Sequence, residues 1–220
     1  CWVWAIGIVL HALLILWFSK NHLANFSIKK VFPTWYIVYV GIVVASVTAN
    51  AHGMESIGQV VFWFGFISYL LLMCLILFRI LKVKDIPEPA LPTLMILAAP
   101  GSLCLAGYIN SFPEKNIFMV YLLMFFSLVF YIVAVALLPG LLKLKFYPSY
   151  SAFCAPLVIS GIGLKLATGF LVKSGFTIPL LKYAVIIEEI VAITITFYVL
   201  ARYIGFLLPA ASPGLKKQHF

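Results

Sequence analysis

Long apolar blocks alternate along the chain with short connections rich in Lys, Pro, Asn and Glu. The blocks are continuously apolar, whereas the strands of a membrane β-barrel alternate apolar and polar residues. Each block has close to the ~20 residues that an α-helix needs to cross ~30 Å of hydrocarbon. The pattern predicts one transmembrane domain, residues 1–208, with about seven helices at 2–18, 35–51, 58–79, 92–109, 117–140, 150–172 and 180–206, and a tail at 209–220.

The composition supports an all-α membrane protein. Hydrophobic residues make up 65% of the chain and charged residues 10%, whereas a soluble domain has about a quarter charged. A soluble fold of this length could not cover so much apolar surface with polar groups.

The basic residues define an orientation. There are fifteen Lys and Arg against six Asp and Glu, an excess that in a soluble protein would suggest nucleic acid. Here they lie mainly in the connections, as membrane topology requires. One side has Lys20, Lys29, Lys30, Arg79, Lys82, Lys84, Lys143, Lys145, Arg202, Lys216 and Lys217, and the other has only Lys115, Lys173 and Lys182. We therefore expect a multi-pass protein of the plasma membrane with a cytoplasmic tail at 209–220, and no nucleic-acid partner.

The first residues suggest that helices are missing upstream. The sequence begins inside an apolar block at Cys1, on the predicted outer side, without an initiator Met or the pattern of a signal peptide.

Candidate metal ligands are scattered. The four cysteines, Cys1, Cys74, Cys104 and Cys154, lie in apolar blocks without a CxxC motif, so we interpret them as packing residues. His11 and His52 have no second His or acid at metal-binding spacing. We expect neither a metal nor a cofactor.

Alternate predicted helices contain Pro and Gly. These are Pro33 and Gly41 in or beside the second, Pro92, Pro100, Gly101 and Gly107 in the fourth, and Pro148, Pro156, Gly161, Gly163 and Gly169 in or beside the sixth. An internal Pro removes a backbone hydrogen bond, and in hydrocarbon the freed carbonyl needs a neighbouring group or cavity water. The alternation favours a pore lined by kinked helices, although Pro and Gly are also generally more frequent in membrane helices.

Three Pro-bounded stretches carry a family resemblance: PTWYIVYVG at 33–41, PTLMILAAP at 92–100 and PSYSAFCAP at 148–156. Together they resemble the tellurite-resistance/dicarboxylate transporter family, which includes the plant slow anion channels. The resemblance implies ten helices in five hairpins around a central pore, assembly as a homotrimer, and kinked odd-numbered helices along the pore. The seven predicted helices look like helices four to ten, so we expect this chain alone to form an incomplete, non-functional channel.

The resemblance also indicates where a gate is expected. The family commonly has a Phe immediately before the Pro or Gly of the ninth helix, but here that position is Ala155, with Phe153 two residues earlier. Two residues correspond to about 200° of helix rotation, so Phe153 should face away from the pore. Either another residue gates the pore, or the pore is wider and suits a larger substrate. The candidate pore residues are Gly41, Pro100, Gly101, Phe153, Ala155, Pro156 and Ser160.

Three charged residues lie well inside predicted helices, away from their ends, where a charge is by default a functional candidate. Lys165 could attract anions, or it could pair with Glu188 or Glu189 or extend to an interface. Lys165 lies nine residues beyond Pro156, about 14 Å along the helix, and therefore nearer a membrane face than the centre. The ion pair or the interface is thus favoured. Glu188 and Glu189 point ~100° apart, so they cannot form a catalytic dyad.

The predicted function is passage of small anions, either inorganic ions or C4-dicarboxylates such as malate, by a channel or a proton-coupled carrier. An intramembrane enzyme would need paired Asp residues, HExxH, or a Ser with a basic partner, but the only Asp, Asp85, lies in a connection. A seven-helix receptor would use Lys165 as a chromophore-binding lysine, but the middle helices offer no acidic counter-ion. We therefore expect a transport protein and not an enzyme.

Overall fold

The computed structural model describes residues 2–24 and 26–208. Within these ranges the secondary structure is entirely helical. Six helices there are long and apolar enough to cross a membrane: Trp2–Leu23, Glu55–Val83, Glu88–Ser111, Ile117–Leu141, Pro148–Lys173 and Pro179–Leu207. The prediction of an all-α membrane protein with about seven helices is confirmed. The predicted tail at 209–220, and Cys1, lie outside the described residues.

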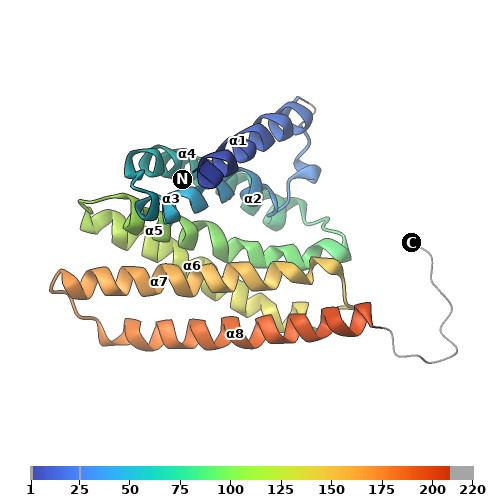
Figure 1. The fold of residues 1–220 in the computed structure, drawn as a ribbon. Helices are drawn as coiled ribbons and strands as arrows, with labels where there is room; N and C mark the ends of the chain where they lie inside the picture. Colours follow the sequence, from blue (N-terminus) through green and yellow to red (C-terminus); the bar gives the residue numbers. More distant parts are fainter. Residues whose placement is uncertain (1, 25, 209–220) are drawn as a thin grey trace, which may run out of the picture.

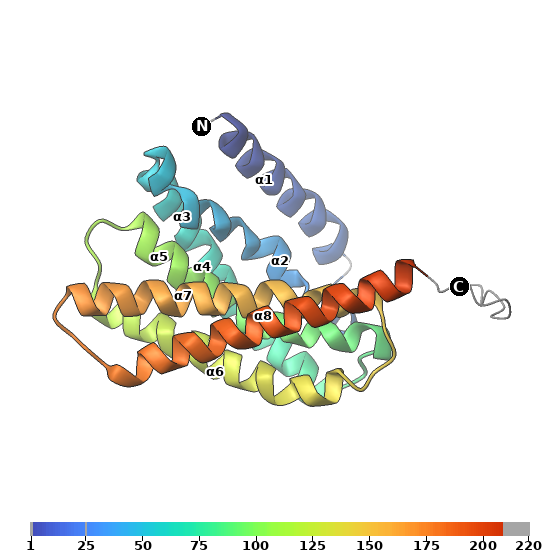
Figure 2. The same ribbon diagram turned by 60° about the horizontal axis from the view of Figure 1, so that its bottom comes forward.

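The helices form a row with two further helices packed against it (Figures 1 and 2). In order of contact, the row consists of α1 (Trp2–Leu23), α2 and α3 (Trp35–Tyr39 and Val44–Thr48), α5 (Ala99–Ser111), α7 (Cys154–Lys173) and α8 (Pro179–Leu207). Helices α4 (Glu55–Phe78) and α6 (Ile117–Leu141) also pack against α5. Helix α5 therefore has neighbours in α3, α4, α6 and α7, and it is the centre of the structure.

The segment predicted as a helix at 35–51 is discontinuous. Between α2 and α3 lies a 3-10 turn, η2 (Gly41–Val43), and a second one, η3 (Asn50–His52), follows α3. Gly53 ends η3 in the left-handed region, with φ of 64°. This broken segment accounts for the difference between the seven predicted helices and the six long ones.

The fourth and sixth predicted helices each begin as a 3-10 helix and continue as an α-helix. Helix η5 (Glu88–Ala98) precedes α5, and η6 (Pro148–Phe153) precedes α7. Pro100 and Pro156 lie in the first turn of their α-helices, where the N–H that Pro lacks has no intrahelical partner anyway. Proline thus marks the point where each segment changes its winding.

Glycines allow α5 to approach its neighbours closely. A Cβ on Gly163 of α7 would lie 2.7 Å from the Ser102 carbonyl oxygen, and a Cβ on Gly107 would lie 2.7 Å from Cγ1 of Val43. A Cβ on Gly101 would lie 3.1 Å from the backbone nitrogen of Ser127 in α6. Small residues at such crossings let membrane helices gain van der Waals contact.

Serine hydroxyls join the same helices. The Ser102 and Ser127 hydroxyls are 2.7 Å apart, between α5 and α6. Ser111 of α5 donates to the Ser46 carbonyl at 2.6 Å, and Ser46 of α3 donates to the Gly58 carbonyl of α4 at 2.7 Å. All four of these serines are fully buried.

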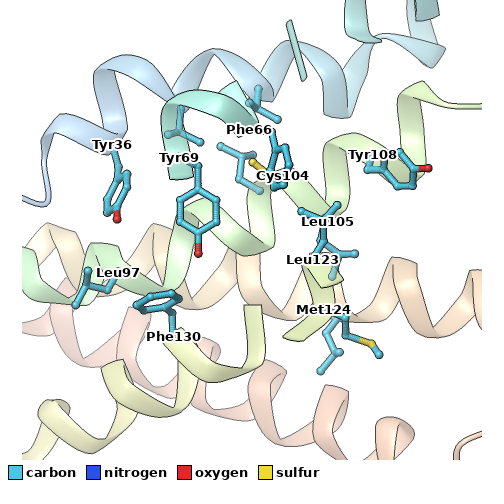
Figure 3. Packing of buried hydrophobic residues seen from close by; sticks show 14 of the residues in the cluster. Tyr36, Phe66, Tyr69, Leu97, Cys104, Leu105, Tyr108, Leu123, Met124 and Phe130 are labelled. Carbon is cyan, nitrogen blue, oxygen red and sulfur yellow. The ribbon is translucent and has the colours of Figure 1, made fainter. Parts of the chain in front are cut away.

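An apolar core surrounds these contacts (Figure 3). Tyr69 of α4 lies near Tyr36 of α2 and Phe130 of α6, with ring centroids 5.9 and 6.5 Å away. Large apolar side chains also cover the outer faces of α1, α4, α6 and α8 and remain exposed. Such surfaces suit a hydrocarbon environment, because lipid tails are as apolar as the side chains themselves.

We expect Gly163→Ala to destabilise the protein, because the new methyl group would push the backbones of α5 and α7 apart. The expected loss is about 1–3 kcal/mol, as for other overpacked interiors, and a thermal unfolding series in detergent measures it. Gly169→Ala in the same helix is the control, since nothing lies within 4 Å of its Cβ position. Equal effects of the two substitutions would contradict the close-packing argument.

Candidate functional site

Three segments change their winding along their length: the α2–α3 segment, η5 with α5, and η6 with α7. These three broken segments share a cavity of about 570 Å³. Its lining residues come from the α2–α3 segment, from η5 and α5, and from η6 and α7. They are Thr34, Tyr36, Ile37, Val40, Gly41, Val44, Thr93, Ile96, Ala99, Pro100, Leu103, Ser149, Ser151, Ala152, Ala155, Pro156 and Ile159. No described residue of α4 or α6 lines the cavity, so it lies on the side of the row away from these two helices.

The cavity surrounds the points where the three segments change their winding. Gly41 begins η2, Pro100 is the second residue of α5, and Ala155 and Pro156 are the second and third residues of α7. Winding changes occur at the same level because η5 packs against η6 and α5 against α7. The sequence feature that interrupts the helices therefore also creates the space between them.

The cavity wall is electrically neutral. None of the described lining residues is charged, and most are apolar. Hydroxyl groups lie towards the N-terminal ends of the three segments, at Thr34, Thr93, Ser149 and Ser151. A partly dehydrated ion in the cavity would therefore meet hydroxyl groups but no fixed counter-charge.

Three of these hydroxyls already donate hydrogen bonds to backbone carbonyls. Thr93 donates to Ala90 at 2.6 Å, and Ser151 donates to Pro148 at 3.2 Å. Ser149 donates to Pro89 at 2.6 Å and so links η6 to η5. Since a hydroxyl has a single hydrogen, each must give up its carbonyl bond to donate to an ion.

The structure brings four of the seven candidate pore residues together. Gly41, Pro100, Ala155 and Pro156 all line the cavity. Ala155 is exposed to it, so its methyl group forms part of the wall.

The other three candidates face elsewhere. Gly101 packs against α6 at Ser127. Phe153 is fully buried, with its ring centroid 4.8 Å from that of Tyr150. Ser160 is buried towards α8, close to Glu188. These residues are separated from cavity residues by one or two positions, and each position turns a helix by ~100°.

Sequence reasoning missed the apolar part of the wall. Ile96 and Leu103 lie four residues before and three after Pro100, and Ile159 lies four residues after Ala155. Residues at such spacing share a helix face, so the spacing from the predicted residues was the available signal. Their residue types alone give none, because Ile and Leu occur throughout the chain.

The intramembrane charges lie outside the cavity wall. Lys165 of α7 donates to Glu189 of α8, with Nζ 2.8 Å from Oε1. Glu188 points into the protein and is only 2% exposed. Of the two partners considered for Lys165, the structure places Glu189 in contact with it.

Among the described residues, no three His, Cys, Asp or Glu side chains are grouped so that they could hold a metal ion. His11 contacts the Val38 carbonyl, with Nε2 2.8 Å from the oxygen, and thereby joins α1 to α2.

The Lys165–Glu189 pair can be tested with a double-mutant cycle. Lys165→Met and Glu189→Gln should each lower the unfolding temperature in nanodiscs, because each leaves one charge unpaired within the membrane span. The double variant should lose less than the sum of the two single losses. Strictly additive losses would show that the pair contributes nothing to stability.

A model of one protein family, described as voltage-dependent anion channel, matches residues 1–204 of this chain. A search of the curated proteins gave no match.

Proposed function

Because the chain belongs to the voltage-dependent anion channel family, we propose that small anions cross the membrane through the cavity between its three broken segments. The family consists of membrane anion channels and transporters, and the resemblance read from the three Pro-bounded stretches is confirmed. One observation supports the path most strongly: the winding changes of all three segments meet at one neutral cavity.

A neutral wall suits rapid passage of anions. Conduction requires binding that is strong enough for entry and weak enough for exit. A fixed cation in the wall would hold an anion, and a fixed carboxylate would repel it. The hydroxyls of Thr93, Ser149 and Ser151 can replace part of the hydration shell at the cost of their carbonyl bonds. Selectivity then follows from the diameter of the path and the cost of dehydration.

The proposed path has a direction relative to the membrane. Basic residues precede each of the three broken segments, among them Lys30, Lys84 and Lys145. The positive-inside rule puts these connections in the cytoplasm, so the hydroxyl end of the cavity faces the cytoplasm in our proposal. The same proposal includes a cytoplasmic C-terminus, a plasma-membrane location and, from the family resemblance, a homotrimer.

Ala155 is the position at which we propose that the width of the path is set. Phe153 belongs to a buried cluster with Tyr150 and Leu157 and would have to leave it to enter the cavity. With only a methyl group at Ala155, the cavity volume falls within the ~300–1,000 Å³ typical of small-molecule sites. That volume suits inorganic anions and C4-dicarboxylates such as malate.

Lys165 gives no support to the receptor alternative. It pairs with Glu189 on the exposed face of α7 and is absent from the cavity wall. A chromophore-binding lysine would instead have to reach an enclosed pocket.

The proposal predicts that Ala155→Phe sharply reduces anion flux, because the added ring would occupy the cavity. Because the chain alone is expected to be non-functional, flux of chloride, nitrate, malate and succinate is measured in proteoliposomes with the ten-helix protein that the family resemblance implies. We expect at least a tenfold loss, about 1.4 kcal/mol in the barrier. Dicarboxylates should lose more than chloride because they are larger.

Ala136→Phe is the matched control, since Ala136 is exposed on α6, away from the cavity. It should leave flux unchanged. If the protein moves no anion, or if Ala155→Phe behaves like Ala136→Phe, the path does not run through this cavity.

A further inference from the structure

Glu188 is a buried acid at the contact between α7 and α8. Its residue is 2% exposed, and a Cβ on Gly161 of α7 would lie 3.8 Å from the Cβ of Glu188. It lies ten residues into α8, well within the span Pro179–Leu207. Its carboxyl group is therefore surrounded by protein inside the membrane rather than by lipid or water.

Two hydroxyl groups lie near this carboxyl group. The Ser160 hydroxyl of α7 lies beside it, and the Tyr131 hydroxyl of α6 is close enough to interact with it electrostatically. Yet among the residues that the structure describes, both Glu188 oxygens and both hydroxyls lack a partner that meets the usual distance and angle limits for a hydrogen bond. In high-resolution structures, buried polar groups of this kind call for an explanation.

No described cation neutralises Glu188. Lys165 of α7 pairs with Glu189, the neighbouring acid on α8. Of the other titratable groups on η6 and α7, Tyr150 donates to the Leu144 carbonyl at 2.8 Å, Cys154 lies near Thr196 of α8, and Lys173 is the last residue of α7.

An unpaired carboxylate inside the membrane is so unfavourable that such a group is normally neutralised instead. The protonated acid has one O–H donor and retains acceptor capacity. A small rotation would let it donate to one of the adjacent hydroxyls and accept from the other. The neutral acid can therefore satisfy both hydroxyls without placing an unpaired charge inside the membrane.

We propose that Glu188 is a proton-binding site: it carries a proton while α7 and α8 are closely packed and releases it to water when they separate. The step is the reversible dissociation of the carboxyl O–H bond, with no other reactant. Its consequence for transport rests on the proposed function. Ile159 lines the cavity and the next residue, Ser160, faces Glu188, so α7 connects the proton site to the path.

The expected direction is higher anion flux at lower pH. Deprotonation would place a negative charge one helix away from the anion path and disturb the packing of α7 at Gly161. Both effects oppose the passage of an anion. Proton binding at Glu188 therefore makes anion movement depend on pH without placing an acid in the cavity wall.

Infrared spectroscopy tests the site independently of transport. The chain has only six Asp and Glu residues, so the carbonyl stretch of a protonated carboxyl group can be assigned by substitution. We expect this band at neutral pH in the unmodified protein in nanodiscs and in Glu189→Gln, and its loss in Glu188→Gln. A band that persists in Glu188→Gln, or that is absent from the unmodified protein, overturns the proposal.

Flux provides the second measurement. In proteoliposomes, chloride flux through the unmodified protein and Glu189→Gln should fall several-fold from mildly acidic to mildly alkaline pH, whereas Glu188→Gln should remain high throughout. An equally steep pH dependence in Glu188→Gln, or failure of this isosteric neutral variant to fold, contradicts the proposal. If no protein moves chloride but the infrared result holds, the proton site stands and the proposed anion path fails.

Discussion

The close approach of α5 to its neighbours is the constraint on which the rest of the structure depends. In a bilayer, burial of apolar surface gives little driving force for helix association, because the lipid is equally apolar. Helix association must instead come from close van der Waals packing and from hydrogen bonds between helices. Gly101, Gly107 and Gly163 remove the side chains that would separate the backbones, and Ser102 and Ser111 add hydrogen bonds at the crossings.

This packing also fixes the cavity. With α3, α4, α6 and α7 held against α5, the irregular starts of the central segments face one another and cannot straighten independently. Pro100 and Pro156 interrupt the winding at positions where the first helical turn tolerates them. A neutral space therefore forms from backbone irregularity rather than from special side chains, and this explains why apolar residues supply most of its wall.

The sequence allowed much of the fold to be predicted, because continuous apolar blocks and their spacing report directly on membrane spans. It did not show that residues 35–51 form several short turns, since Gly41 and the surrounding Val and Ile residues are also compatible with one kinked helix. Winding type depends on packing, here on the contact of Val43 with Gly65 of α4, which no local pattern reveals.

The candidate site was predictable only in part for a similar reason. Pro and Gly indicate where helices break, and Gly41, Pro100, Ala155 and Pro156 do lie together at the cavity. Which face each segment turns towards the cavity depends on small rotations at the change from 3-10 to α winding, so Gly101 and Ser160 point to other helices. The same limitation applied to the two acids, because only the packing distinguishes Glu188 from its half-exposed neighbour Glu189.

The most direct test of the anion path is the reactivity of single cysteines towards a small, negatively charged thiol reagent, in a variant whose native cysteines are replaced. Ile159→Cys places a thiol in the cavity wall, and Val158→Cys places one on the neighbouring face of α7, outside it. The account predicts that the reagent modifies Ile159→Cys in proteoliposomes and blocks chloride flux, while flux through Val158→Cys persists. An unreactive Ile159→Cys, or modification without loss of flux, would contradict a path through this cavity.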